Sequence, residues 1–310
     1  MGSPRGKLLL VGAAFLVGLG LSFWLERLPA PRAEGSAPSQ APARGFEFRH
    51  RRVICMSPAV VEIAFALGAG PRVVGVSQHS KYPPQALQKP LCGGYFNRNY
   101  EIILSLRPDL IVTQGKAEEL TDFAQTNGIE IVSLDLRDLD SIFAETERLG
   151  RVLEVEAEAE LLCAELRHRL AQVRVKVSRK PRVGVVLVAG REPGALNDIF
   201  AVGPGEFLHD LIEIAGGRNV FDDLHTGYAV VSKEALLQRA PEVVVELHGE
   251  GADAAATERE ARRLWQAFPT LPAVRQGRVH VIESTYAMIP GPRVVRLAER
   301  LAEILHGEDR

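Results

Sequence analysis

Residues 101–112 read EIILSLRPDLIV, and residues 234–245 read EALLQRAPEVVV. In both stretches a glutamate opens a short helical run, a proline closes it, and an acidic residue then precedes an apolar strand, with the same spacing throughout. The proline ends the helix because it lacks an amide donor and because it moves the preceding residue, Arg107 or Ala240, out of the α region. This internal duplication predicts two similar lobes.

Around these stretches, short β-rich segments alternate with helical ones, which favours α/β layers over an all-helical or sandwich fold. Strands are predicted at residues 52–56, 72–77, 109–114 and 129–135 in the first half and at residues 182–188, 241–247 and 278–284 in the second half. Ser57 and Pro58 suit the cap and first turn of a helix that ends near Gly68. A parallel or mixed sheet in each lobe would place the loops that follow its strands along one edge.

An unbroken helical pattern follows Asp140 and separates the two halves. Its second part, residues 155–177, carries one apolar stripe on an otherwise charged helix. The stripe consists of Leu162, Leu166, Leu170, Val173 and Val177. At 1.5 Å per residue, these ~23 residues would reach ~35 Å, about the diameter of a small domain, which predicts a strut that packs across two lobes. A coiled-coil helix is the alternative.

The predicted fold class is therefore α/β, with two Rossmann-like lobes joined by one long α-helix. The predicted parts are an N-terminal lobe at residues 49–150, a connecting helix at residues 151–180 and a C-terminal lobe at residues 181–310.

The first residues carry a targeting pattern that is not part of this fold. Arg5 and Lys7 precede an apolar run at residues 8–25, which as a helix would span roughly 27 Å and could cross a membrane. No convincing small-residue cleavage site follows, so residues 1–28 are predicted to be an uncleaved anchor, with a cleaved signal peptide as the alternative. The flanking charges favour an amino terminus inside the cell and the remainder outside. The Pro-, Ala- and Ser-rich residues 29–48 predict a flexible linker.

Composition argues against several functions. The chain carries 37 lysines and arginines against 39 aspartates and glutamates, so no overall field attracts it to nucleic acid. Cys55 and Cys92 could pair in an oxidising compartment or remain two buried thiols. The sequence has no nucleophile elbow, phosphate-binding loop or metal-ligand spacing, and the GPG sequence at 203–205 is interpreted as a turn before a helix. We therefore expect no catalytic residues, no metal site and no enzyme activity.

Aromatic and polar side chains recur at the predicted strand-to-helix turns of both halves. They are His79, Tyr82, Tyr95, Phe96, Tyr228 and Tyr286. If the lobes face each other along the carboxyl ends of their strands, these side chains converge on a crevice suited to a large, partly apolar ligand. Glu101 and Glu234 have two interpretations. Either each stabilises the first turn of its helix, or both pair with basic residues of a two-fold symmetric partner.

Six motifs, in this order, resemble the class III substrate-binding proteins of ABC importers, the helical-backbone group that includes cobalamin, haem and ferric-siderophore receptors. The motifs are RVICMSPAVVEIAFALGAG (52–70), VVGVSQHSKYPP (73–84), NYEIILSLRPDLIV (99–112), AVGPGEFLHDLIEIAGGRNVF (201–221), VSKEALLQRAPEVVV (231–245) and LWQAFPTLPAVRQGRVHVI (264–282). The resemblance covers about residues 50–306. It implies two α/β lobes bridged by one long helix, a ligand in the cleft between them, and delivery to a membrane permease with its ATPase.

The resemblance also implies roles for individual residues, and it is nearest to the cobalamin-binding members. Tyr95 and Tyr228 match positions of cleft aromatics in that group, and His79 stands where an aromatic often does. Gln114 and the loop 286–290 match other cleft positions but lack the expected aromatic and arginine. The implied ligand-binding residues are His79, Tyr95, Gln114, Tyr228, Tyr286 and Met288.

Two further roles are implied by the same resemblance. Glu101 and Glu234 match the two lobe glutamates that form salt bridges with arginines of the permease, and Trp265 matches a packing position. The implied cargo is cobalamin or a related corrinoid first, and haem or a ferric siderophore second, with no resident cofactor. The protein is expected in the periplasm, tethered to the inner membrane by residues 8–25. An anchored envelope sensor and a Rossmann-like enzyme are the other functions considered, and the export signal argues against the enzyme.

Overall fold

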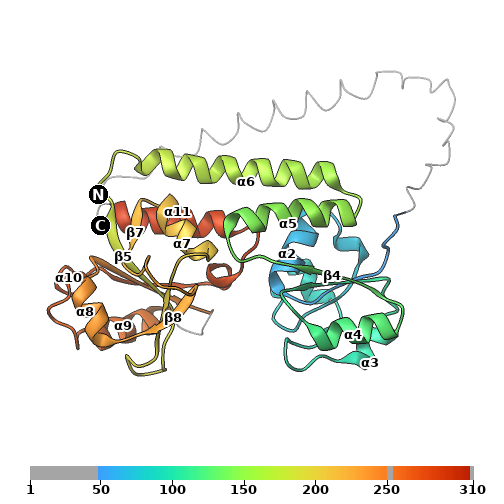
Figure 1. The fold of residues 1–310 in the computed structure, drawn as a ribbon, viewed down its shortest axis with the longest axis horizontal. Coiled ribbons are helices and arrows are strands. Elements are labelled where there is room, and N and C mark those ends of the chain that lie inside the picture. Colours follow the sequence, from blue (N-terminus) through green and yellow to red (C-terminus); the bar gives the residue numbers. More distant parts are fainter. Residues whose placement is uncertain (1–47, 250–253, 308–310) are drawn as a thin grey trace, which may run out of the picture. The chain divides into compact units, whose positions relative to one another are not determined.

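The computed structural model describes residues 48–249 and 254–307, which lie in one compact unit (Figure 1). The predicted anchor at residues 1–28, its apolar run at 8–25 and all but the last residue of the predicted linker lie outside the described residues. Among the residues that are described, no helix is both long enough and apolar enough to cross a membrane.

The N-terminal lobe is built on a four-stranded parallel sheet in the order β2-β1-β3-β4. The strands are β1 (Val53–Cys55), β2 (Val73–Val76), β3 (Leu110–Gln114) and β4 (Glu130–Leu134), each where the sequence predicts one. The helical segments are α2 (Pro58–Ala66), η2 (Gly70–Arg72), η3 (Pro84–Gln88), α3 (Tyr100–Ser105) and α4 (Glu118–Thr126). Ser57 caps α2 as predicted, because its side chain accepts a hydrogen bond from the Val60 amide. Both faces of this sheet are covered, since Val53 and Ile54 point into different core clusters.

The C-terminal lobe contains a mixed sheet in the order β10-β9-β5-β6-β8, with β7 also beside β5. Its strands are β5 (Val183–Gly190), β6 (Ile199–Val202), β7 (Gly217–Asn219), β8 (Tyr228–Val231), β9 (Val243–His248) and β10 (Val279–Glu283). Its helical segments are α7 (Phe207–Ile214), α8 (Lys233–Arg239), α9 (Ala254–Trp265), α10 (Pro272–Arg275), η4 (Thr285–Met288) and α11 (Val294–His306). Strands β5, β9 and β10 are the predicted ones and run parallel, whereas β6 and β8 are antiparallel additions.

Two helices replace the unbroken helix that the sequence predicts after Asp140. They are α5 (Leu139–Val152) and α6 (Glu156–Val177), so the connecting helix begins five residues later than predicted. The chain turns between them, and Glu154 adopts a left-handed φ of 54° that ends the first helix. The helices then pack closely, because a Cβ at Gly150 would lie only 2.5 Å from the Cβ of Ala159.

The connecting helix α6 extends over both lobes (Figure 1), and it contacts α5 as well as α7 and α11 of the C-terminal lobe. Its predicted apolar stripe faces the interior: Leu166, Leu170, Val173 and Val177 are buried and Leu162 is partly buried. The same core cluster continues from β1 to α11, which makes α6 a shared wall of the two lobes rather than half of a coiled coil.

The duplicated stretches have the same local structure in the two lobes. The side chains of Asn99 and Ser232 cap α3 and α8, each accepting from the amide three residues later. At the other end, Arg107 and Ala240 adopt φ values of 44° and 46°, in the left-handed region, directly before a proline. The sequence correctly predicts that both residues leave the right-handed α region, and the repeat of caps and backbone angles confirms the duplication.

Candidate functional site

Three of the six predicted ligand residues lie at the carboxyl edge of the N-terminal sheet. His79 is exposed in the loop after β2, Gln114 is the last residue of β3, and Tyr95 lies in the loop before α3. The Tyr95 hydroxyl donates to the backbone oxygen of Lys116 at 3.0 Å, which ties its loop to the end of β3. The structure therefore brings these three residues to one edge.

A residue that the sequence did not single out, Gln78, links the same loops. Its amide nitrogen lies 2.8 Å from His79 Nε2, and its Oε1 accepts a hydrogen bond from Asn97 at 3.4 Å. Beside them, a hollow of about 410 Å³ is lined by Tyr95, Phe96 and the start of α4. The N-terminal lobe thus presents aromatic faces and amide groups together.

Two predicted ligand residues of the C-terminal lobe, Tyr286 and Met288, lie in η4, directly after the parallel strand β10. The Ser284 side chain begins this turn by accepting from the Tyr286 amide at 3.4 Å. Tyr286 is partly buried against the core, whereas Met288 is about half exposed. Both therefore lie at the carboxyl edge, where the sequence places them.

Tyr228 is not in the strand-to-helix turn that the sequence predicts. It is the first residue of β8, an antiparallel edge strand, and pairs with Val202 of β6. The prediction was wrong because it did not foresee the β6–β8 pair, which reverses the direction of the chain at this edge. Tyr228 is still 40% exposed, and its hydroxyl donates to Glu206. Burial, followed by the neighbouring carboxylate, raises the pKa of the Tyr228 hydroxyl well above its usual value.

Glu206 is the residue before α7, and the start of α7 lies against the segment that joins β4 to α5. There the Phe207 amide donates to the Arg137 backbone oxygen at 2.6 Å, and the Leu139 amide donates to Asp210 Oδ2 at 3.0 Å. Burial raises the pKa of Glu206, and the hydrogen bond from Tyr228 and the charge of Arg137 oppose that effect. Tyr228 is therefore held, through Glu206, beside a segment of the N-terminal lobe.

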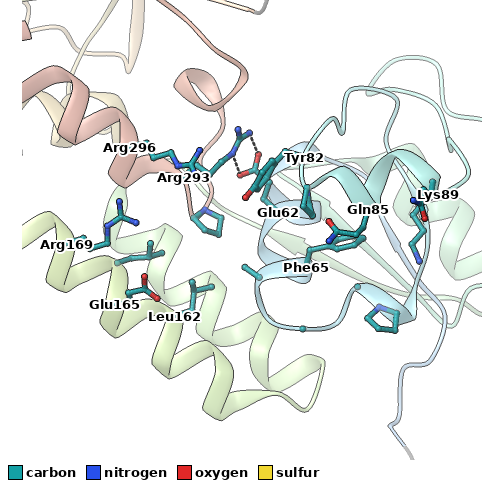
Figure 2. Close-up of a pocket in the computed structure, with 18 residues that line it drawn as sticks. Glu62, Phe65, Tyr82, Gln85, Lys89, Leu162, Glu165, Arg169, Arg293 and Arg296 are labelled. Carbon is teal, nitrogen blue, oxygen red and sulfur yellow. Dashed lines mark hydrogen bonds and ion pairs between the residues drawn. The ribbon is translucent and has the colours of Figure 1, made fainter. Parts of the chain in front are cut away.

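A second connection between the lobes joins α2 to the residue before α11. Arg293 donates to both carboxylate oxygens of Glu62, at 2.9 and 2.6 Å, beside the ring of Tyr82 (Figure 2). The guanidinium carbon is 4.2 Å from the centre of the Tyr82 ring and 5.8 Å from that of Tyr286. The loops after β2 and β10 therefore meet at Arg293, which brings the carboxyl edges of the two sheets together.

A cavity of about 660 Å³ adjoins this ion pair, between α2, η3, α6 and the start of α11 (Figure 2). Phe65, Leu162 and Leu166 supply apolar walls, and Arg169 and Arg296 supply charge. None of the six predicted ligand residues lines it. The cavity and the predicted ligand residues are therefore separate features of the molecule.

Sequence reasoning also missed a charged cluster at the end of β9. Glu246, 1% exposed, contacts Arg191, His248 and Trp265. Burial raises the pKa of Glu246, but hydrogen bonds from His248, Arg191 and Trp265 outweigh it, so the pKa lies below its usual value. The sequence did carry a signal for this cluster, because Glu246 is a lone acid inside the apolar run VVVEL. Glu62, inside VVEIAFAL, is the same kind of signal for the ion pair with Arg293. Trp265 is fully buried, as the packing prediction requires.

Glu101 and Glu234 occupy equivalent sites. Each is the second residue of its helix, α3 or α8, and each is exposed. Hydrogen bonds from its own backbone amide and from Ser232 lower the pKa of Glu234. The exposed leucines Leu104 and Leu237 follow one turn later on the same helix faces. The exposed faces of α3 and α8 therefore carry the same pair of side chains, a carboxylate and a leucine.

Cys55, Cys92 and Cys163 are free, buried thiols in the structure. Burial raises the pKa of Cys55 to about 12 and that of Cys92 to about 11, so neither is a reactive thiolate at neutral pH. Within the described residues, no group of three or more His, Cys, Asp or Glu side chains could hold a metal ion. The GPG sequence at 203–205 forms a turn before α7, as predicted.

Comparison with known proteins agrees with this architecture. The family model described as "Periplasmic binding protein" matches residues 53–286. A vitamin B12-binding protein of Vibrio cholerae is 27% identical over 260 residues, which cover 83% of this chain and 90% of that protein. The crystal structure of the periplasmic vitamin B12-binding protein of Vibrio cholerae superposes with a TM-score of 0.67 and 28% identity, covering 83% of this chain and 96% of that one. A periplasmic haem-binding protein in complex with two haems gives a TM-score of 0.69 at 25% identity, over 82% of this chain and 98% of that one.

Proposed function

Because this chain belongs to the periplasmic binding protein family, we propose that it captures cobalamin or a related corrinoid between its two lobes and delivers it to an ABC importer. The supporting observation is that loops after parallel strands of both sheets meet at Arg293 in a chain whose architecture extends over 96% of a vitamin B12-binding protein. Ligands of open α/β sheets bind at such carboxyl edges.

The proposed ligand residues fit a flat, amide-rimmed macrocycle. Tyr95 and Tyr228 are 54% and 40% exposed, and their rings offer apolar faces from opposite lobes. His79, Gln114 and Tyr286 add polar groups at the same edges, and Met288 adds a flexible apolar one. The connecting helix α6 and the Glu62–Arg293 pair restrict the lobes to small movements, so affinity depends on a largely preformed site.

The test is titration of the purified full-length chain with cyanocobalamin, dicyanocobinamide and haemin, followed by tryptophan and tyrosine fluorescence and by visible absorbance. Saturable, submicromolar binding of a corrinoid is the expected result. A chain that binds neither corrinoid contradicts the proposal.

Haem or a ferric chelate is the second candidate ligand. It is favoured by the similarity to a structure that holds two haems and by the tyrosine and histidine side chains at both edges, which are suitable donors to iron. In the same titration, binding of haemin with a shifted Soret band and no binding of either corrinoid would select this candidate. An anchored sensor that retained the fold would bind the ligand without supporting its uptake.

Delivery requires a permease and its ATPase, and we place the sites that dock on the permease at Glu101 and Glu234. The equivalent positions of these carboxylates suit a partner with two-fold symmetry that presents arginines. The family is periplasmic, and we further propose that residues 8–25 tether the chain to the inner membrane. Recovery of the full-length chain in washed membranes, and its release when residues 1–28 are replaced by a cleavable signal peptide, is the expected result.

A further inference from the structure

The buried carboxylate of Glu246 fixes the hydrogen-bonding role of a histidine at the edge of the C-terminal sheet. Its Oε1 accepts from Arg191 Nε at 2.8 Å and from Trp265 Nε1 at 2.6 Å, and its Oε2 lies 2.8 Å from His248 Nε2. Since the pKa of Glu246 is lowered, the group is ionised at neutral pH and can only accept. The hydrogen between Glu246 and His248 must therefore belong to Nε2 of the imidazole.

A neutral imidazole with its proton on Nε2 has a lone pair on Nδ1. Among the described residues, nothing donates to His248 Nδ1, and the side chain is 30% exposed. Arg191, 6% exposed, compensates the charge of Glu246, so the cluster presents one hydrogen-bond acceptor rather than a net negative charge. The contact with Glu246 thus leaves Nδ1 as the acceptor, and no donor among the described residues uses it.

The backbone places His248 at the edge where the lobes meet. His248 is the last residue of β9 and pairs in register with Glu283, the last residue of β10. Its carbonyl oxygen accepts from the Ser284 amide at 3.0 Å, immediately before the turn that carries Tyr286. Because the Tyr286 ring lies beside Arg293, which is paired with Glu62 of the other lobe, His248 belongs to the edge that faces the N-terminal lobe.

We propose that His248 Nδ1 accepts a hydrogen bond from a primary amide of the bound ligand and so selects amide-rimmed macrocycles over carboxylate-rimmed ones. The inference rests on the proposed capture of a tetrapyrrole-like ligand between the lobes. Most peripheral side chains of cobinamide end in primary amides, which donate hydrogen bonds, whereas the propionates of haem and the side chains of cobyrinic acid are ionised and only accept. A carboxylate facing this lone pair finds no donor unless the imidazole first takes up a proton, and that cost disfavours the carboxylate ligand.

The test compares dicyanocobinamide with dicyanocobyrinic acid, which share a corrin ring and differ at its rim. Affinities are measured by absorbance titration at pH 7.5 for the full-length wild type, His248→Leu and His248→Gln. Glutamine keeps both functions, since its amide nitrogen can donate to Glu246 while its oxygen accepts from the ligand. His168→Ala, on an exposed part of α6, is the control for a histidine remote from the proposed site.

We expect the wild type to prefer dicyanocobinamide, and we expect His248→Leu to weaken its binding by about 3- to 10-fold while leaving that of dicyanocobyrinic acid unchanged. His248→Gln and His168→Ala should retain the preference. An unchanged preference in a folded His248→Leu variant, with both ligands still bound, overturns the role of His248 and leaves the proposed function intact. If the wild type binds neither corrinoid, both the role of His248 and the proposed function are overturned. If His248→Leu weakens the binding of the two ligands equally, the role of His248 is structural instead.

Discussion

Glu62 and Arg293 are separated by 231 positions in the chain and form a bidentate ion pair between the lobes, with side chains only 2% and 10% exposed. Burial raises the pKa of Glu62, and the Arg293 guanidinium opposes this. A charge pair so far out of water holds its partners in place because neither charge is stable there alone. The pair therefore fixes α2 against the start of α11.

Removing one partner of this pair should destabilise the protein strongly. We expect Arg293→Met to lower the free energy of unfolding by about 3–5 kcal/mol, because Glu62 is left as an uncompensated buried charge. The double variant Glu62→Leu/Arg293→Met should lose much less, since it leaves no charge behind. Urea denaturation of the three proteins measures both quantities. A double variant as unstable as the single one would show that Arg293 acts through its contacts with Tyr82 and Tyr286 instead.

A glycine in place of Ala240, the left-handed residue that ends α8, should stabilise the protein. Ala240 has a φ of 46°, a conformation that costs a residue with a Cβ about 1–2 kcal/mol and costs glycine almost nothing. We expect Ala240→Gly to raise the free energy of unfolding by about 0.5–1 kcal/mol after the greater chain entropy of glycine is subtracted. Ala235→Gly, inside α8, is the matched control and should lower it by a similar amount. Denaturant midpoints that fall in both variants would contradict the strain at Ala240.

Much of this architecture could be predicted because it depends on local signals. The apolar runs around Val53 and Val244 specify strands, and Pro108 and Pro241 end helices wherever they occur. The β6–β8 pair was missed because strands of four residues with partly exposed side chains carry too little periodicity. Contacts such as the Glu62–Arg293 pair depend on how the lobes pack, and no spacing along the chain encodes that.

The predicted ligand residues show the same division. His79, Gln114 and Tyr286 follow parallel strands, so their place at the edge of a sheet follows from strand direction alone. Tyr228 reaches the neighbourhood of the other lobe through Glu206, a contact that only the folded chain shows.

The aromatic rings of both lobes should contribute to corrinoid affinity. We expect Tyr95→Ala and Tyr228→Ala each to weaken binding by about 1–2 kcal/mol, or roughly 5- to 30-fold, because each removes an exposed aromatic face. Tyr95→Phe and Tyr228→Phe should keep most of the affinity, since the hydroxyls are engaged with Lys116 and Glu206 rather than with a ligand. Fluorescence titration with dicyanocobinamide separates these cases. Alanine variants with wild-type affinity would remove these residues from the proposed site.

Stability should fall as the solution is acidified below neutral pH, partly because of His280. Burial, together with Arg262 and Arg278, lowers the pKa of this histidine in the folded protein below the 6.5 of the unfolded chain. As the pH falls through 6.5, the unfolded chain therefore binds a proton at this histidine before the folded protein does. The free energy of unfolding decreases as a result. We expect His280→Gln to show a shallower loss of stability than the wild type between pH 7.5 and 5.5 in urea denaturation. Parallel curves would mean that other groups, such as His306, carry the dependence.

Docking should depend on both equivalent glutamates while ligand capture does not. We expect Glu101→Ala/Glu234→Ala to abolish corrinoid uptake in cells whose own copy of the gene is deleted. The affinity of the purified variant should be unchanged, because both carboxylates are exposed and neither is among the proposed ligand residues. Glu156→Ala/Glu158→Ala, two exposed acids in the first turn of α6, is the matched control for a general effect on charge or helix stability.

Each single glutamate variant should give an intermediate rate of uptake, because a two-fold symmetric partner would retain one of its two contacts. Lowered denaturant midpoints of the purified glutamate variants would point to the helix dipole as the main role of these residues, since a carboxylate in the first turn contributes about 0.3–1 kcal/mol. Normal uptake by the double variant at wild-type protein levels would assign docking to another surface, and the exposed leucines Leu104 and Leu237 on the same helix faces would then be the next residues to replace.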